Sequence, residues 1–217
     1  MIEAIIFDND GLLIDSEPVW DQARRDLAQS VNRVWNTDDH QAVMGVSTET
    51  WATYMIKRLE LSLSIEEVVQ QIVQRMAKIY QKELPFLPGA KEAIRLAADS
   101  YPTAIASGSH PDLLEIVGNH PDVKRHIKVI ISADTLANGK PAPDVYLETA
   151  NRLNIPADRC LCLEDSGNGI LAGVRAGMIV VAIPNEQFPP APDILNQAHH
   201  ILKSLEEFPQ LLENLKQ

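Results

Sequence analysis

Cysteine is scarce in this sequence: 217 residues include only Cys160 and Cys162. A disulfide scaffold needs more cysteines, and two that lie two positions apart on an extended segment cannot bridge comfortably. Their spacing also differs from that of zinc sites. We therefore expect two buried, reduced thiols in a cytoplasmic protein.

Positive charge is also in short supply. The chain has 19 Lys and Arg against 30 Asp and Glu, a formal net charge of −11. Nucleic acids and anionic membrane surfaces are bound by basic surfaces, so we expect neither as a partner. A small anionic substrate stays possible, because a metal ion can reverse the potential inside one pocket. We expect the protein to be a monomer.

Long apolar stretches are missing as well. None approaches the roughly 20 residues of a membrane helix, and the N-terminal run is too short for a signal peptide. Short, unbroken runs recur instead, and they suit strands that are buried on both faces of a parallel sheet. These runs are Ala4–Phe7, Thr103–Ala106, Val129–Ile131, Cys160–Leu163 and Ile179–Ile183.

Helical patterns lie between the later runs. They begin near Pro88, His110, Pro143 and Ser166, and Gly118 is expected to end the second of them. Strands that alternate with helices predict an α/β domain with right-handed crossovers.

The region 15–84 breaks this alternation, because it contains no convincing strand. Apolar residues from Ile65 to Ile79 recur at helical spacing, and Ser64 with Glu67 forms a capping box before them. The pattern predicts an all-helical insertion over 15–84, which divides the α/β core into 1–14 and 85–217.

Two carboxylates follow the first predicted strand, at Asp8 and Asp10. Side chains alternate along a strand, so both project to the same side. In open α/β sheets, ligands bind beyond the carboxyl ends of the strands. Two close carboxylates favour a hard cation such as Mg²⁺ between them. A solvated turn is the alternative, since Asp and Asn are common turn residues.

Polar residues follow three further predicted strands, and each group has two interpretations. Ser107 and the Gly108 amide suit a phosphate oxygen, although Ser109 also suits a helix N-cap. Lys140, between Gly139 and Pro141, suits a phosphoryl group or an ordinary surface position. Glu164 and Asp165 suit a metal ion or a helix cap.

Taken together and in this order, the four segments resemble the motifs of the haloacid dehalogenase (HAD) superfamily of phosphatases. The resemblance rests on Asp8-Asn9-Asp10-Gly11, Ser107, Lys140 and Glu164-Asp165, and it spans nearly the whole chain. It implies a Rossmann-like parallel-sheet core with a small helical cap inserted after the first strand. The stretch from Asp10 to Pro18 is similar to the β-phosphoglucomutase branch, and most similar to hexitol-phosphate and 2-deoxyglucose-6-phosphate phosphatases.

The resemblance also implies roles for residues. Asp8 would be the nucleophile that forms an aspartyl phosphate, and Asp10 the general acid and then base. Mg²⁺ would be held by Asp8, the Asp10 main chain, Asp165 and Glu164. Ser107, the Gly108 amide and Lys140 would bind the phosphoryl oxygens, and Lys140 would neutralise their charge. Glu17, where the cap begins, could face the substrate or pack between cap and core.

The expected function is therefore Mg²⁺-dependent hydrolysis of small phosphomonoesters, such as sugar or sugar-alcohol phosphates. Two alternatives remain. One is phosphoryl transfer of the β-phosphoglucomutase kind, although 15–26 lacks that family's histidine and Gly45-Val46-Ser47 is followed by Thr48 instead of arginine. The other is a phosphosugar-binding module without activity, because fold alone does not fix function.

Overall fold

The computed structural model describes residues 1–185 and 189–215, which fold as two compact units. One unit joins Met1–Asp15 to Pro85–Gln217, and the other is Ser16–Leu84. The sequence placed Asp15 in the insertion, whereas it lies with the α/β unit. The reason is local pairing, since the Asp15 N–H donates to the Pro85 carbonyl at 2.8 Å.

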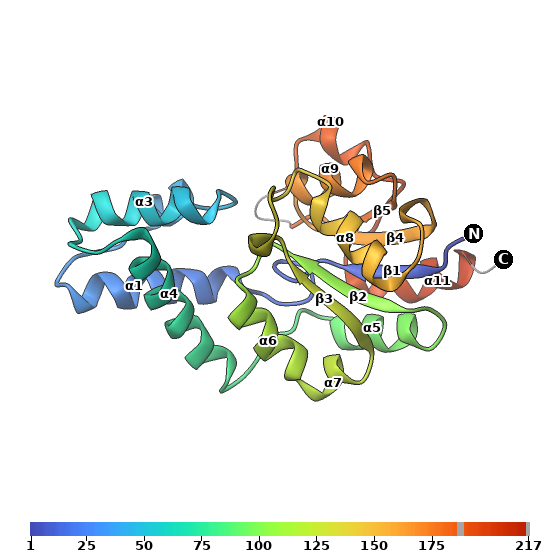
Figure 1. Ribbon diagram of the computed structural model, residues 1–217, viewed down its shortest axis with the longest axis horizontal. Coiled ribbons are helices and arrows are strands. Elements are labelled where there is room, and N and C mark those ends of the chain that lie inside the picture. Colours follow the sequence, from blue (N-terminus) through green and yellow to red (C-terminus); the bar gives the residue numbers. More distant parts are fainter. Residues whose placement is uncertain (186–188, 216–217) are drawn as a thin grey trace. The chain divides into compact units, whose positions relative to one another are not determined.

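A parallel sheet forms the centre of the α/β unit (Figure 1). Among the described residues, its six strands lie in the order β3-β2-β1-β4-β5-β6. The direction of strand addition reverses between β1 and β4, and such a switch point opens a crevice at the carboxyl ends of the strands. The strands are β1 (Ala4–Phe7), β2 (Thr103–Ser107), β3 (Ile127–Ser132), β4 (Cys160–Glu164), β5 (Ile179–Ala182) and β6 (His200–Ile201).

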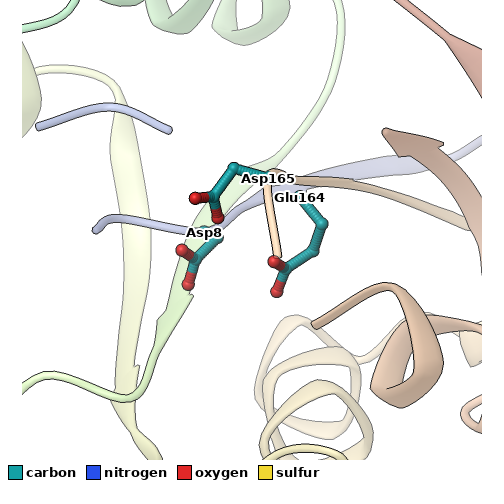
Figure 2. A group of neighbouring side chains, drawn as sticks. All are labelled: Asp8, Glu164 and Asp165. Carbon is teal, nitrogen blue, oxygen red and sulfur yellow. The ribbon is translucent and has the colours of Figure 1, made fainter. Parts of the chain in front are cut away.

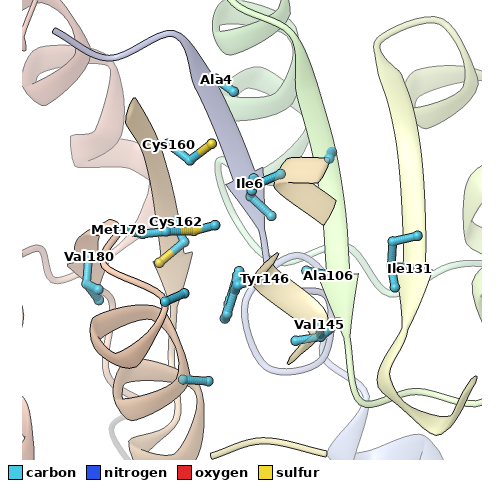
Figure 3. Close-up of a cluster of buried hydrophobic side chains, with 14 of the residues drawn as sticks. Ala4, Ile6, Ala106, Ile131, Val145, Tyr146, Cys160, Cys162, Met178 and Val180 are labelled. Atoms are coloured by element: carbon cyan, nitrogen blue, oxygen red, sulfur yellow. The ribbon is translucent and has the colours of Figure 1, made fainter. Parts of the chain in front are cut away.

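Helices cover both faces of the sheet. Ile6 of β1 belongs to a buried cluster with α8 and α9 (Figure 3), whereas the next residue, Phe7, packs against Phe208 of α11 with ring centroids 6.1 Å apart. This alternation explains why the strand is apolar throughout. The helices of this unit are α5 (Ala90–Ala98), α6 (Pro111–Asn119), α7 (Pro121–Lys124), α8 (Asp144–Leu153), α9 (Gly167–Arg175), α10 (Pro192–Leu195) and α11 (Phe208–Leu215), with short 3-10 turns at Ala133–Thr135, Ala157–Arg159 and Leu205–Glu207.

The second unit, in which every residue is described, is entirely helical. The Ser64–Glu67 capping box is confirmed: the Ser64 hydroxyl accepts from the Glu67 N–H at 3.2 Å, and the Glu67 carboxylate accepts from the Ser64 N–H at 2.7 Å. Its helices are α1 (Glu17–Ser30), α2 (Thr37–Ala42), α3 (Thr48–Leu59) and α4 (Ile65–Tyr80). No helix in the described residues is long and apolar enough to cross a membrane.

Two details differ from the sequence expectations. Gly118 does not end α6, which continues to Asn119 because the following His120 precedes a proline and is extended. Gly118 instead allows a close approach, since a Cβ there would lie 2.6 Å from the Ile130 Cδ1 of β3. Strand β6 was not expected, because two residues form no recognisable apolar run.

Candidate active site

Side chains from separate motifs meet where three neighbouring strands end. Asp8 directly follows β1, Ser107 ends β2, and Glu164 ends β4. Strand β1 lies between the other two, so these ends are adjacent. All of the predicted site residues except Glu17 therefore belong to one edge of the sheet or to the segment that leads into α8.

Lys140 links two of these strand ends. Its Nζ donates to Asp8 Oδ1 at 2.6 Å, to Glu164 Oε1 at 2.5 Å and to the Ala106 carbonyl at 3.1 Å. An ammonium group has three protons, and these three acceptors match them. Its side chain is 11% exposed, so Lys140 is a positioned charge in a buried site and does not occupy the ordinary surface position that the sequence left open.

Three buried carboxylates converge at this edge of the sheet (Figure 2), and two of them, Asp8 and Glu164, accept hydrogen bonds from Lys140. Asp8, Glu164 and Asp165 each offer an oxygen atom, and these atoms lie within 4.8 Å of one another. Among residues 1–185 and 189–215, the buried Asp165 Oδ1 has no hydrogen-bond partner. An all-oxygen donor set with an unsatisfied carboxylate oxygen suits a hard divalent cation such as Mg²⁺.

A neighbouring glycine makes room for this group. Gly11 has φ +77°, and a Cβ on it would lie 2.1 Å from Asp165 Oδ2. Any side chain at position 11 would therefore collide with Asp165. The glycine that follows the Asp8–Asp10 motif is explained by both its backbone conformation and this contact.

The electrostatics of the site disfavour the ionised forms of two of these carboxyl groups, Asp8 and Asp165. Burial raises the pKa of Asp8 to about 8, against the lowering effect of Lys140 and with a further rise from Glu164 and Asp10. Burial, together with the Asp8 and Glu164 carboxylates, raises the pKa of Asp165. Burial alone would lower the pKa of Lys140, but Asp8 and Glu164 together raise it above its ordinary value. Lys140 is thus charged, and Asp8 and Asp165 favour a proton or a metal ion.

Asp10 faces the end of β2. Its Oδ2 accepts from the Ser107 hydroxyl at 3.0 Å and from the Ser109 hydroxyl at 2.5 Å. The sequence offered Ser109 as a helix N-cap, and that interpretation is wrong. The N-cap of α6 is His110, whose Nδ1 accepts from the Asp112 N–H at 3.3 Å. Ser109 is free to contact Asp10 because the cap is supplied one residue later.

Tyr146 of α8 is a site residue that the sequence reasoning missed. Its buried hydroxyl donates to Glu164 Oε1 at 2.5 Å, and the Lys140 Nζ lies 5.1 Å from its ring centroid. Burial and the nearby Glu164 carboxylate raise the pKa of Tyr146, so the hydroxyl stays a donor. The sequence held one signal for this contact. Tyr146 lies six residues after Lys140, on the face of α8 that otherwise carries apolar core residues.

Gly108 and Glu17 are the remaining two predicted site residues. Gly108 is exposed just after β2, where its amide follows Ser107. Glu17 begins α1 in the helical unit, where its Oε2 lies 3.3 Å from His40 Nε2. In the same unit, the Arg24 guanidinium lies 5.1 and 5.7 Å from the ring centroids of Trp20 and Trp51, which contact each other edge to face. A substrate role for Glu17 stays a prediction.

The family model of the haloacid dehalogenase-like hydrolases matches residues 2–177. The chain belongs to this family. The expected HAD superfamily membership, the α/β fold with a parallel sheet and the assignment as a HAD-type hydrolase are thereby confirmed.

Several relatives of this HAD-like hydrolase are named as phosphatases. Hexitol phosphatase B of Escherichia coli (strain K12) is 32% identical over 204 residues, which are 93% of this chain and 89% of that protein. The "Probable pseudouridine-5'-phosphatase" of Drosophila melanogaster is 34% identical over 211 residues, 94% and 90% of the two chains. The structure of CbbY from Rhodobacter sphaeroides in complex with phosphate is similar with a TM-score of 0.82, at 24% identity and 96% coverage of both chains, and it shows the shared fold.

Proposed function

We propose that this HAD-like hydrolase is a Mg²⁺-dependent phosphatase that hydrolyses small phosphomonoesters through an aspartyl-phosphate intermediate. The observation that supports the proposal best is the convergence of Asp8, Lys140, Glu164 and Asp165 at adjacent strand ends. A nucleophile, a fixed positive charge and an oxygen donor set for a metal are the parts that phosphoryl transfer requires.

The first step transfers the phosphoryl group to Asp8. A carboxylate oxygen of Asp8 forms a bond to phosphorus while the bond from phosphorus to the ester oxygen breaks. Asp10 gives its proton to the departing oxygen, which leaves as an alcohol. Lys140, Ser107 and the Gly108 amide bind the phosphoryl oxygens, and Lys140 offsets their negative charge.

The second step restores Asp8. A water molecule attacks phosphorus and passes a proton to Asp10, and the bond between phosphorus and the Asp8 oxygen breaks to release inorganic phosphate. The carboxylates of Asp8, Asp165 and Glu164 and the Asp10 main-chain carbonyl would hold Mg²⁺. When bound, Mg²⁺ supplies positive charge that offsets these carboxylates and the phosphoryl oxygens.

The proposed substrates are sugar or sugar-alcohol phosphates. Two considerations support this class: the sequence resemblance to hexitol-phosphate phosphatases and the relatives named as hexitol and pseudouridine-5' phosphatases. A screen of phosphate release with Mg²⁺ should therefore include hexitol phosphates, hexose phosphates and pseudouridine 5'-phosphate. The proposed partner is the small phosphorylated metabolite alone, bound by a monomer in the cytoplasm.

The test of the mechanism is Asp8→Asn, which keeps the shape of the side chain but removes the nucleophilic carboxylate. We expect Mg²⁺-dependent phosphate release to disappear while the circular dichroism spectrum stays that of the wild type. Asp158→Asn is a matched control, because Asp158 is exposed and precedes β4 at the opposite end from Glu164. Full activity of Asp8→Asn, or turnover that persists in excess EDTA, would contradict the proposal.

The same assay separates the two alternatives. A phosphoglucomutase converts β-glucose 1-phosphate into glucose 6-phosphate without net phosphate release, and coupled detection of glucose 6-phosphate measures that reaction. A binding module would hold a phosphosugar in calorimetry but release no phosphate. Retention of Asp10, a residue that binding alone does not need, supports hydrolysis over the binding module.

A further inference from the structure

The Asp10 carboxylate is held asymmetrically. Its Oδ2 accepts two hydroxyl hydrogen bonds, from Ser107 at 3.0 Å and Ser109 at 2.5 Å. Its Oδ1 is buried and has no hydrogen-bond partner within the described part of the chain. One oxygen is therefore fixed by the protein, and the other is the atom left to exchange a proton with a bound molecule.

We propose that Ser109 is a positioning residue that keeps Asp10 oriented with Oδ1 toward the leaving oxygen during phosphoryl transfer. The inference rests on the proposed function, because it concerns the step in which Asp10 gives up its proton. Ser109 does not touch the reacting atoms in this proposal. It acts through Asp10.

Ser107 cannot keep the Asp10 carboxylate oriented by itself once a phosphoryl group is bound. A serine hydroxyl has one proton and donates one hydrogen bond at a time. If Ser107 donates to a phosphoryl oxygen, as its place at the end of β2 suggests, its bond to Asp10 Oδ2 is lost. The Ser109 hydroxyl then remains as the donor that fixes the carboxylate.

Ser109 is itself held firmly. It is 3% exposed, its carbonyl accepts from the Ser132 hydroxyl at 2.6 Å, and its N–H donates to Ser107 Oγ at 3.0 Å. The first bond ties the loop after β2 to the end of β3, and the second ties it to the end of β2. A hydroxyl on such a fixed backbone can hold a carboxylate with little loss of entropy at the moment of reaction.

The role of Ser109 predicts a selective defect. Protonation of the leaving oxygen matters most for a basic leaving group such as an alkoxide, and least for a weakly basic one such as 4-nitrophenolate. A misoriented Asp10 should therefore slow alkyl esters far more than 4-nitrophenyl esters. Loss of packing or of folded protein would slow both substrates alike.

The experiment compares kcat/KM for benzyl phosphate and 4-nitrophenyl phosphate in wild type and Ser109→Ala, with Mg²⁺ present. These esters have similar size but different leaving groups. Because general acid catalysis typically contributes about 10²–10⁴-fold, we expect a fall of at least about tenfold for benzyl phosphate and of less than about threefold for 4-nitrophenyl phosphate. If Ser109→Ala does not fold, Ser109→Cys allows the same comparison, since a thiol fills the space but donates weakly.

Thr103→Val is the matched control. Thr103 is buried in β2, and its hydroxyl donates to the His126 carbonyl at 2.6 Å, four residues before Ser107. We expect it to change both substrates by the same factor. Equal losses for both substrates in the Ser109 variant, or no loss, would overturn the role of Ser109. A wild type that releases no phosphate from any phosphomonoester with Mg²⁺ would instead overturn the proposed function itself.

Discussion

Glu164 has room in the site because residue 169 has no side chain. A Cβ at Gly169 would lie 1.8 Å from Glu164 Oε2. Gly169 is in the first turn of α9, where alanine would ordinarily favour the helix by up to about 1 kcal/mol. This separation is far shorter than any real contact between atoms. We therefore expect the steric clash to outweigh the gain in helix propensity and to displace the Glu164 carboxylate.

Gly169→Ala should therefore weaken Mg²⁺ binding. Changes to groups around a metal site typically cost about 10–100-fold in affinity, and isothermal titration calorimetry measures the loss directly. Gly139→Ala is the control, because no described atom lies within 4 Å of a Cβ at that position. Unchanged Mg²⁺ affinity in Gly169→Ala would show that Glu164 does not need its observed position.

At the scale of single residues, the sequence predicted side chains that follow a strand and missed those that reach the site from elsewhere. Asp8, Glu164 and Asp165 could be placed because each follows an apolar run. Tyr146 could not, because its contact depends on how α8 packs on the sheet. The place of Ser109 in the site could have been predicted. The two-residue spacing that puts Asp8 and Asp10 on one side also relates Ser107 to Ser109.

At the scale of elements, the capping box of α4 is a local pair of hydrogen bonds, and its contribution to stability can be measured separately. Ser64→Ala removes the acceptor of the Glu67 N–H, and loss of a serine N-cap typically costs about 1 kcal/mol. We expect the free energy of unfolding of the helical unit to fall by about this amount in urea denaturation followed by circular dichroism.

Two further variants test whether that loss comes from the cap. Ser64→Asp keeps an acceptor for the Glu67 N–H, so it should retain most of the stability. Ser62→Ala removes an exposed hydroxyl just before the helix and should leave the stability unchanged. A loss in Ser62→Ala as large as in Ser64→Ala would contradict the assignment to the capping box.

Elements were predicted well where one physical signal dominates. The five expected strands all form, each within two residues of the expected ends. Four of them are buried on both faces and therefore apolar almost throughout, whereas the edge strand β3 is partly exposed and carries Lys128 before its apolar run. Strand β6 gives no such signal, since its two residues are placed by pairing with β5. Gly118 gave a signal that was misleading. Glycine is typical of helix ends, but this one lies inside α6 and allows close packing against Ile130.

At the scale of the whole molecule, the formal charge of −11 and the proposed phosphate site are compatible because of where the acids lie. Asp8, Glu164 and Asp165 are buried together, with Lys140 beside them. This arrangement costs folding free energy when the carboxylates are ionised without a metal. A bound divalent cation offsets that cost, so metal binding and stability should be linked.

The pH dependence of stability tests this link. Asp8 ionises near 3.8 in the unfolded chain but at a pKa of about 8 in the metal-free folded state. Between these values the folded state holds more protons, so its stability is greatest at low pH and decreases as the pH rises. Asp8→Asn cannot ionise. We expect its Tm in EDTA to exceed that of the wild type by a margin that grows between about pH 5 and pH 8.

Mg²⁺ should stabilise the wild type more strongly as the pH rises. It competes with the proton for the carboxylates, so the rise in wild-type Tm on adding Mg²⁺ should be small near pH 5 and larger near pH 8. At a concentration of about 100 times the dissociation constant, binding contributes about 2.7 kcal/mol to stability. Asp165→Asn removes one donor and should reduce the rise at every pH. Two outcomes would show that these carboxylates are not the groups that link pH and metal binding to stability. One is a Tm difference between Asp8→Asn and the wild type in EDTA that does not change with pH, and the other is a Mg²⁺-induced rise in Tm that shrinks as the pH rises.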